Sequence, residues 1–203
     1  MGNLIKSIYA GIMIGFGGTV YLSMENRIVG AILFSFGLLT IITQQFNLYT
    51  GKVGYKNRIK DLMITIIGNA LGIFLIAFMI QLSKPELIEV SNNIWQKKML
   101  YSGNQAVILS IFCGAMMYLA VDNFKKSHNL IFIMLPVVIF ILSGFEHSIA
   151  NLFYMFLSNN YNKNSIIFIL ICLLCNGVGA KIMNYYNVAM ESLIMRNKYD
   201  GKR

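Results

Sequence analysis

The sequence predicts an all-α membrane protein with six transmembrane helices, arranged as two inverted three-helix repeats whose second and fifth helices are broken. Hydrophobic residues make up 57% of the 203-residue chain and charged residues only 12%, which is about half the charged share of a soluble domain. The abundance of Ile, Leu, Phe and Met excludes a disordered chain. A spanning helix needs about 20 residues, so this length has room for about six.

Six apolar segments follow one another along the chain, and each must be helical because lipid offers the backbone no hydrogen-bond partner. They cover residues 5–24, 28–42, 62–82, 106–121, 130–143 and 166–180, the last with a polar extension. The first follows a single charge, Lys6, and lacks a small-x-small cleavage site, which predicts an uncleaved helix. We expect one transmembrane domain over residues 1–203, with a first repeat at about 5–82 and a second at about 103–195.

The placement of charge decides what the excess of 17 Lys and Arg over 8 Asp and Glu means. The basic residues cluster between apolar segments, which is typical of a membrane protein and disfavours nucleic-acid binding. With the N-terminus inside, the inner segments hold eleven of them: Lys6, Lys52, Lys56, Arg58, Lys60, Lys125, Lys126, Arg196, Lys198, Lys202 and Arg203. The outer loops hold five: Arg27, Lys84, Lys97, Lys98 and Lys163. This excess predicts a multi-pass protein of the cell membrane (inner or plasma) with both termini in the cytoplasm.

The second and fifth segments lose their apolar character before they could cross a bilayer. The second continues as TQQFNLYTG over residues 43–51, and the fifth as SGFEHS over residues 143–148. Interrupted segments at matching places in two halves indicate a transport site near the bilayer midplane. The third and sixth segments share an Asn-x-x-Gly element, Asn69 to Gly72 and Asn176 to Gly179. This element either marks the internal repeat or simply allows close helix packing.

Glu146 and His147 form the only ionisable pair inside an apolar segment. Such groups are expensive in lipid and normally face a pathway, and an unperturbed histidine titrates at about 6.5. We therefore expect His147 to line a pathway and Glu146 to hold the break through hydrogen bonds to backbone donors. A membrane-embedded enzyme is disfavoured, because the chain has no H-E-x-x-H motif and its other histidine, His128, lies in a loop. The three cysteines indicate packing, and no metal or cofactor is expected.

The stretch SGFEHSIAN, residues 143–151, resembles the signature of the formate/nitrite transporter family. Residues 47–51, the two Asn-x-x-Gly elements and Leu135-Pro136-Val137 also resemble motifs of that family, in order along nearly the whole chain. The resemblance implies an aquaporin-like protomer within a homopentamer in the lipid bilayer. It also implies a separate pore in each protomer for small monovalent anions such as formate, nitrite or hydrosulfide.

The resemblance further implies roles for particular residues. Thr50 and His147 match the facing polar pair at mid-pore, and Asn69 and Asn176 are expected to support the helix breaks. The apolar constrictions on either side of the polar pair correspond to Phe34, Leu38, Leu48 and Phe140. Lys98 matches a lysine that attracts anions near the outer entrance, although it could instead extend to the interface as an ordinary helix-end lysine.

The chain departs from the family pattern at a few positions. Asn47 stands where an acidic residue is usual, and Gly114 stands where an asparagine is common. Lys181 is an unfamiliar charge, which we expect at the inner interface, paired with Glu191 or at the pore mouth. The chain is shorter than typical members of the family that it resembles, so the second halves of the broken helices, or their loops, are expected to be abbreviated.

An anion cannot cheaply cross a dry ring of Phe and Leu, because burying an unpaired charge costs many kcal/mol. We expect His147 to act as a proton relay that lets a weak-acid anion pass as the neutral acid. The alternatives are an aquaporin-like channel for neutral solutes such as water or ammonia, and a relative with a purely structural role.

Overall fold

The computed structural model describes residues 2–55 and 58–200, and every regular element among them is an α-helix. Three basic residues used above for the orientation, Lys56, Lys202 and Arg203, lie outside the described residues. The first half of the chain forms α1 (Gly2–Leu22), α2 (Arg27–Thr43), α3 (Tyr49–Lys52) and α4 (Ile59–Ser83). The Asn26 side chain starts α2 by accepting hydrogen bonds from the amides of Ile28 and Val29.

The second half forms α6 (Gly103–Ser127), α7 (Ile131–Leu142), α8 (Ser148–Leu157) and α9 (Lys163–Asp200). Within residues 2–55 and 58–200, four helices are long and apolar enough to cross a membrane: α1, α4, α6 and the part of α9 up to Ile194. The apolar helices α2, α7 and α8 are shorter. The six predicted segments thus correspond to α1, α2, α4, α6, α7 and α9, while α3 and α8 follow the two interruptions.

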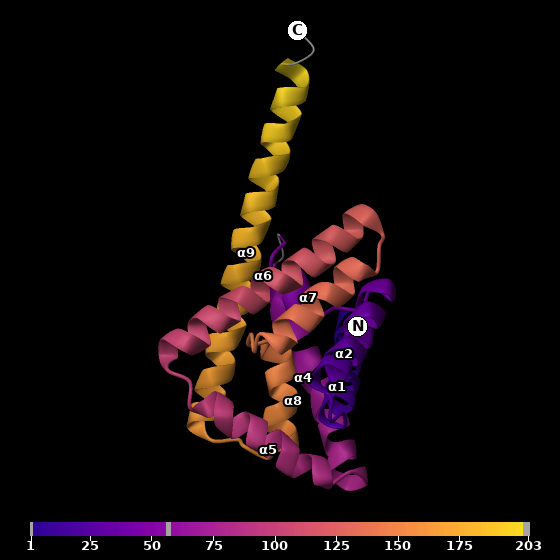
Figure 1. Cartoon of the computed structure of the whole chain (residues 1–203), viewed down its shortest axis with the longest axis vertical. Helices are drawn as coiled ribbons and strands as arrows, with labels where there is room; N and C mark the ends of the chain where they lie inside the picture. Colours follow the sequence, from indigo (N-terminus) through magenta and orange to yellow (C-terminus); the bar gives the residue numbers. More distant parts are fainter. Residues whose placement is uncertain (1, 56–57, 201–203) are drawn as a thin grey trace.

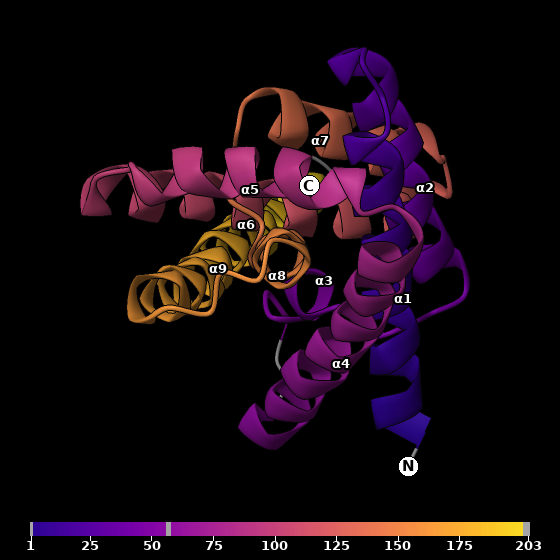
Figure 2. The same cartoon turned by 90° about the horizontal axis from the view of Figure 1, so that it is seen from below.

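Between the halves lies α5 (Glu86–Met99), which the sequence analysis did not predict. Acidic residues in its first turn and basic residues in its last turn complement the helix dipole. Its buried side chains, Leu87, Ser91 and Trp95, recur every four residues and so share one face. Figure 2 shows α5 lying across the ends of other helices, and it contacts α1, α4, α8 and α9.

Glycines hold the long helices together in two pairs, α1 against α4 and α6 against α9. A Cβ at Gly11 would collide with the Asn69 carbonyl of α4, and a Cβ at Gly114 would collide with the Asn176 carbonyl of α9. The same holds for the glycines of the two Asn-x-x-Gly elements, since each meets a backbone carbonyl of the opposing helix. Close packing is therefore one function of these elements.

The helix α9 is unusually long, and Figure 1 shows its C-terminal part extending beyond the other helices. Polar contacts with the end of α6 hold this part: Asn187 donates to Asp122 at 2.9 Å, and Lys126 forms ion pairs with Asp122 and Glu191. The sequence suggests Lys181 as one partner for Glu191. Instead Lys126 is its ion-pair partner, and Lys181 is an exposed residue of α9.

Candidate functional site

The two helix breaks follow the same backbone course. After α2 the chain enters the left-handed region at Gln45 (φ 55°), and after α7 it does so at Gly144 (φ 70°). The next amides, of Phe46 and Phe145, donate back to carbonyls of the helices they leave, at 2.8 and 2.9 Å. The chain then runs extended into α3 or α8. Both helices thus end through the left-handed turn that commonly closes a helix.

Asn69 of α4 holds the first break. Its Oδ1 accepts the amide of Tyr49, the first residue of α3, at 2.9 Å. Its Nδ2 donates to the carbonyls of Ser7 on α1 and Asn47 in the break, both at 2.8 Å. One buried side chain therefore satisfies an amide and a carbonyl that the break would leave without partners, and it ties them to α1.

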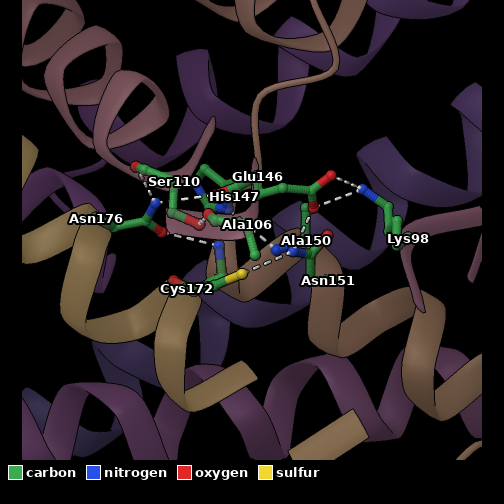
Figure 3. A network of polar contacts seen from close by, with 10 residues as sticks. Lys98, Ala106, Ser110, Glu146, His147, Ala150, Asn151, Cys172 and Asn176 are labelled. Carbon is green, nitrogen blue, oxygen red and sulfur yellow. Dashed lines mark hydrogen bonds and ion pairs between the residues drawn. The ribbon is translucent and has the colours of Figure 1, made fainter. Parts of the chain in front are cut away.

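Asn176 of α9 holds the second break through the same three bonds. Its Oδ1 accepts the amide of Ser148, the first residue of α8, at 2.9 Å. Its Nδ2 donates to the carbonyls of Ser110 on α6 at 2.8 Å and of Glu146 at 2.9 Å (Figure 3). Both asparagines are fully buried. In each half, the helix that follows the break supports it.

Thr50 and His147 meet where the two breaks face one another. Thr50 Oγ1 lies 2.9 Å from His147 Nε2, and both residues are buried. His147 precedes α8, and its Nδ1 accepts the amide of Ala150 at 3.1 Å. Because Nδ1 is occupied as an acceptor, the neutral ring carries its proton on Nε2 and donates it to Thr50.

Glu146 is fully buried. The sequence predicts that it accepts hydrogen bonds from backbone donors, but its partners in the structure are side chains. Its carboxylate accepts Lys98 Nζ at 2.8 and 2.7 Å and Asn151 Nδ2 at 2.8 Å, as Figure 3 shows. Lys98 does not extend to the interface as a helix-end lysine: only 14% of its side chain is exposed, because α5 directs it at Glu146. Asn151 was not singled out from the sequence, although it ends the signature stretch.

A first cavity of about 370 Å³ opens on one side of the polar pair. We call it the Lys98 cavity; Phe34, Phe140, His147 and Lys98 are among its lining residues. The Phe34 and Phe140 rings pack edge to face with centroids 6.1 Å apart, and Phe140 stacks on His147 at 5.5 Å. Two further basic residues, Arg27 and Lys97, also line this cavity.

A second cavity of about 780 Å³ includes Leu38, Leu48 and Gly51 in its lining. We call it the lysine cavity, since Lys6, Lys52 and Lys125 also line it. Leu38 and Leu48 are each 2% exposed. An aromatic pair therefore lines one cavity together with His147, and a leucine pair lines the other together with Gly51, which follows Thr50 in the chain. In the part of the chain that the structure describes, no group of three metal-ligating side chains occurs.

Comparison with known proteins agrees with this arrangement. A family model described as "Formate/nitrite transporter" matches residues 1–188. The formate channel FocA of Escherichia coli (strain K12) is 31% identical over 159 residues, which cover 67% of this chain and 55% of FocA. The formate channel FocB of the same strain is 25% identical over 181 residues, which cover 73% and 64% of the two chains. The match with each covers less than two thirds of that relative's length.

Solved structures share the fold. A pentameric formate channel with formate bound superimposes with a TM-score of 0.76 at 20% identity, covering 96% of both chains. An FNT family ion channel gives a TM-score of 0.70 at 19% identity, covering 90% of this chain and 83% of that one. The relatives are channels and transporters rather than enzymes, and the apolar helices are those of a multi-pass membrane protein. The chain belongs to the formate/nitrite transporter family.

Proposed function

We propose that the chain forms a channel for small monovalent weak-acid anions (formate, nitrite or hydrosulfide), with its pore between the two helix breaks. One observation carries this proposal: the buried Thr50–His147 pair joins the two breaks, with Phe34 and Phe140 beside His147 in one cavity lining and Leu38 and Leu48 beside Gly51, the neighbour of Thr50, in the other. The names of the formate channels among its relatives support formate in particular. A neutral-solute channel has no comparable support, because basic residues in its two cavities would not attract an uncharged solute.

The cavities and the constrictions act on the anion in opposite ways. Arg27 and Lys97 on one side and three lysines on the other raise the local anion concentration. Phe34, Phe140, Leu38 and Leu48 offer no polar group to a charge, which would lose its hydration there. A weak acid avoids this cost by crossing as its neutral form, and chloride cannot do so.

His147 supplies the proton in this proposal. A ring protonated at both nitrogens gives the Nε2 proton to the anion, which forms the neutral acid. The neutral imidazole that is left keeps its proton on Nδ1, so it is the opposite tautomer to the ring that accepts the Ala150 amide. Beyond the constriction the acid releases its proton, which returns to the ring. Both nitrogens of the charged ring are donors, so the charged ring cannot accept the Ala150 amide as the neutral ring does. The ring therefore has to leave that bond in order to load a proton.

The surrounding polar groups hold the relay in place. We assign Asn69 and Asn176 to the support of the two breaks, and Glu146 to the support of the second break through Lys98 and Asn151. Lys98 anchors Glu146, which lines the same cavity, so this ion pair adds no net charge there, and the positive charge of the Lys98 cavity comes from Arg27 and Lys97.

The proposed architecture is a six-helix protomer in one transmembrane domain, with inverted aquaporin-like repeats at about 5–82 and 103–195. The paired contacts of Asn69 and Asn176, and the matched left-handed turns at Gln45 and Gly144, support it. The pentameric state of the similar formate channel supports a homopentamer. The excess of basic residues supports cytoplasmic termini in the cell membrane, which would place the lysine cavity on the cytoplasmic side.

The proposal is tested with purified protein in liposomes, by measuring uptake of formate, nitrite and hydrosulfide across pH. Uptake should rise as the external pH falls, and chloride serves as the control solute because its conjugate acid is too strong to form. Replacing His147→Asn or His147→Phe should remove the pH dependence and most of the uptake. Unchanged uptake and pH dependence in both variants would disprove the relay. Transport without proton movement or current would indicate the neutral-solute channel instead.

A further inference from the structure

The lysine cavity has a lining whose formal charge is only positive. Lys6 comes from α1, Lys52 ends α3, and Lys125 lies near the end of α6, so three separate elements direct ammonium groups to one place. Lys125 lies over the Tyr55 ring, 3.8 Å from its centroid, which holds it against the cavity wall. Among the described residues that line this cavity, none is an aspartate or a glutamate.

Two carboxylates outside the lining act on its lysines, Asp61 on Lys52 and Asp122 on Lys125, but each also has a basic partner of its own. Asp61 pairs with Arg58 at 3.3 Å, and Asp122 pairs with Lys126 at 2.8 Å. The charges of Lys6 and Lys125 both act on Lys52. Like charges gathered in one space repel one another, and the repulsion falls when an anion enters. A monovalent anion offsets one of the three charges, whereas a polyvalent anion offsets two or three.

We propose that the lysine cavity binds a polyvalent phosphate anion. Lysine ammonium groups bind phosphate oxygens as point charges, without the planar geometry that arginine imposes. A volume of about 780 Å³ is far more than formate needs and is within the range of pockets for much larger ligands. Leu38 and Leu48 line this cavity and are each buried, and in the proposed pore they form the apolar constriction that a hydrated polyvalent anion would not pass.

An occupant of this cavity covers one mouth of the pore. Binding stands on the cavity alone, while the expected block of anion flux rests on the function proposed above. The phosphate groups can come from a soluble polyphosphate or from a lipid headgroup at the membrane surface, since both present the same oxygens to the three lysines.

Binding is tested with the full chain in detergent, by calorimetric titration with inorganic tripolyphosphate. Lys52→Gln and Lys125→Gln should each weaken binding about tenfold, the loss of one charge-assisted contact. Lys125→Arg should retain binding because the charge stays. Lys163→Gln removes the same charge from an exposed residue at the start of α9 and should leave binding unchanged. No measurable binding to the wild type, or an equal loss in Lys163→Gln, overturns the proposal.

Two further measurements identify the source and separate this site from channel function. Tripolyphosphate binding is measured in nanodiscs of phosphatidylcholine alone and in nanodiscs that also contain a phosphoinositide. Weaker binding in the second kind shows that the lipid competes and assigns the site to a headgroup. Equal binding in both assigns it to a soluble ligand. Formate flux is then measured with tripolyphosphate on the side of the lysine cavity. Binding in a protein without flux would refute the proposed channel and keep the site, whereas flux without binding would refute the site and keep the channel.

Discussion

Lys98 Nζ donates to both carboxylate oxygens of Glu146, at 2.8 and 2.7 Å, and this ion pair joins α5 to the second helix break. Glu146 is followed directly by His147, so a helix outside the six apolar segments fixes the backbone beside the central histidine. Trp95 strengthens this position, because its Nε1 donates to Ser165 of α9 at 3.1 Å. The helix α5 is therefore part of the site and more than a connection between halves.

Removing the lysine from this pair should be costly. Lys98→Met leaves the carboxylate of Glu146 buried without its cation, which should lower the free energy of unfolding by about 3–5 kcal/mol. The double variant Lys98→Met with Glu146→Gln should recover much of that loss, because no buried charge remains. Unfolding of each variant in detergent measures the effect. A double variant less stable than Lys98→Met would show that the pair does not act through charge.

The two asparagine supports should be equally important. Asn176→Ala leaves the Ser148 amide and two carbonyls without their partner, and Asn69→Ala does the same at Tyr49. Each change should cost about 2–4 kcal/mol. Asn123→Ala, at a partly buried position on α6, is the matched control and should cost much less. If either support could be removed as cheaply as Asn123, the contact it makes would not hold the break.

The contact between α6 and α9 should not tolerate a methyl group. Gly114→Ala places a Cβ against the Asn176 carbonyl and should destabilise the protein by about 1–3 kcal/mol. Gly103→Ala, where the same atom meets open space at the start of α6, should be neutral or stabilise by up to about 1 kcal/mol. Thermal unfolding of both variants gives the comparison. Similar values for the two would mean that the helices can separate without loss.

Thr50 should matter through its hydroxyl. Thr50→Val keeps the shape but removes the acceptor of the His147 Nε2 proton, and formate uptake in liposomes should fall about tenfold, the value of one buried hydrogen bond. Thr50→Ser keeps the hydroxyl and should stay close to the wild type. The unfolding temperature should fall modestly in Thr50→Val, because the buried Nε2 proton loses its acceptor, and should stay near the wild type in Thr50→Ser. Equal uptake by Val and Ser variants would remove Thr50 from the relay.

The sequence was sufficient to predict the family, which is confirmed, and the all-helical nature of the chain. The interruptions were visible because TQQFNLYTG and SGFEHS follow apolar runs. The helix α5 was not predicted, because its polar residues outnumber the three buried ones that form its inner face. The partners of Glu146 were also missed, since Lys98 lies 48 residues earlier and only the folded chain brings the two together.

The left-handed turns at Gln45 and Gly144 also show that contacts between distant residues cannot be predicted from a local sequence pattern. Gly144 is a residue for which a positive φ is ordinary, but Gln45 adopts φ 55° although its side chain disfavours that region. Local preference therefore suggests one turn and argues against the other. The turn at Gln45 exists because α1 and α4 bind the backbone groups that follow it: the amide of Asn47 donates to Lys6, and the Asn47 carbonyl accepts from Asn69. A local sequence pattern does not contain these contacts. The relay, the inverted repeats and the pentamer remain predictions.

Each asparagine binds groups of its own half alone: Asn69 joins α1, α3 and α4, and Asn176 joins α6, α8 and α9. The Thr50–His147 bond, by contrast, crosses from one half to the other. The Thr50–His147 contact thus joins two halves of the chain, which we call blocks, and each block is held together by its own asparagine. In the proposed channel, a small slide of one block against the other would open or close this contact while leaving both asparagine supports intact, so the flow of anions would be adjusted without any local unfolding.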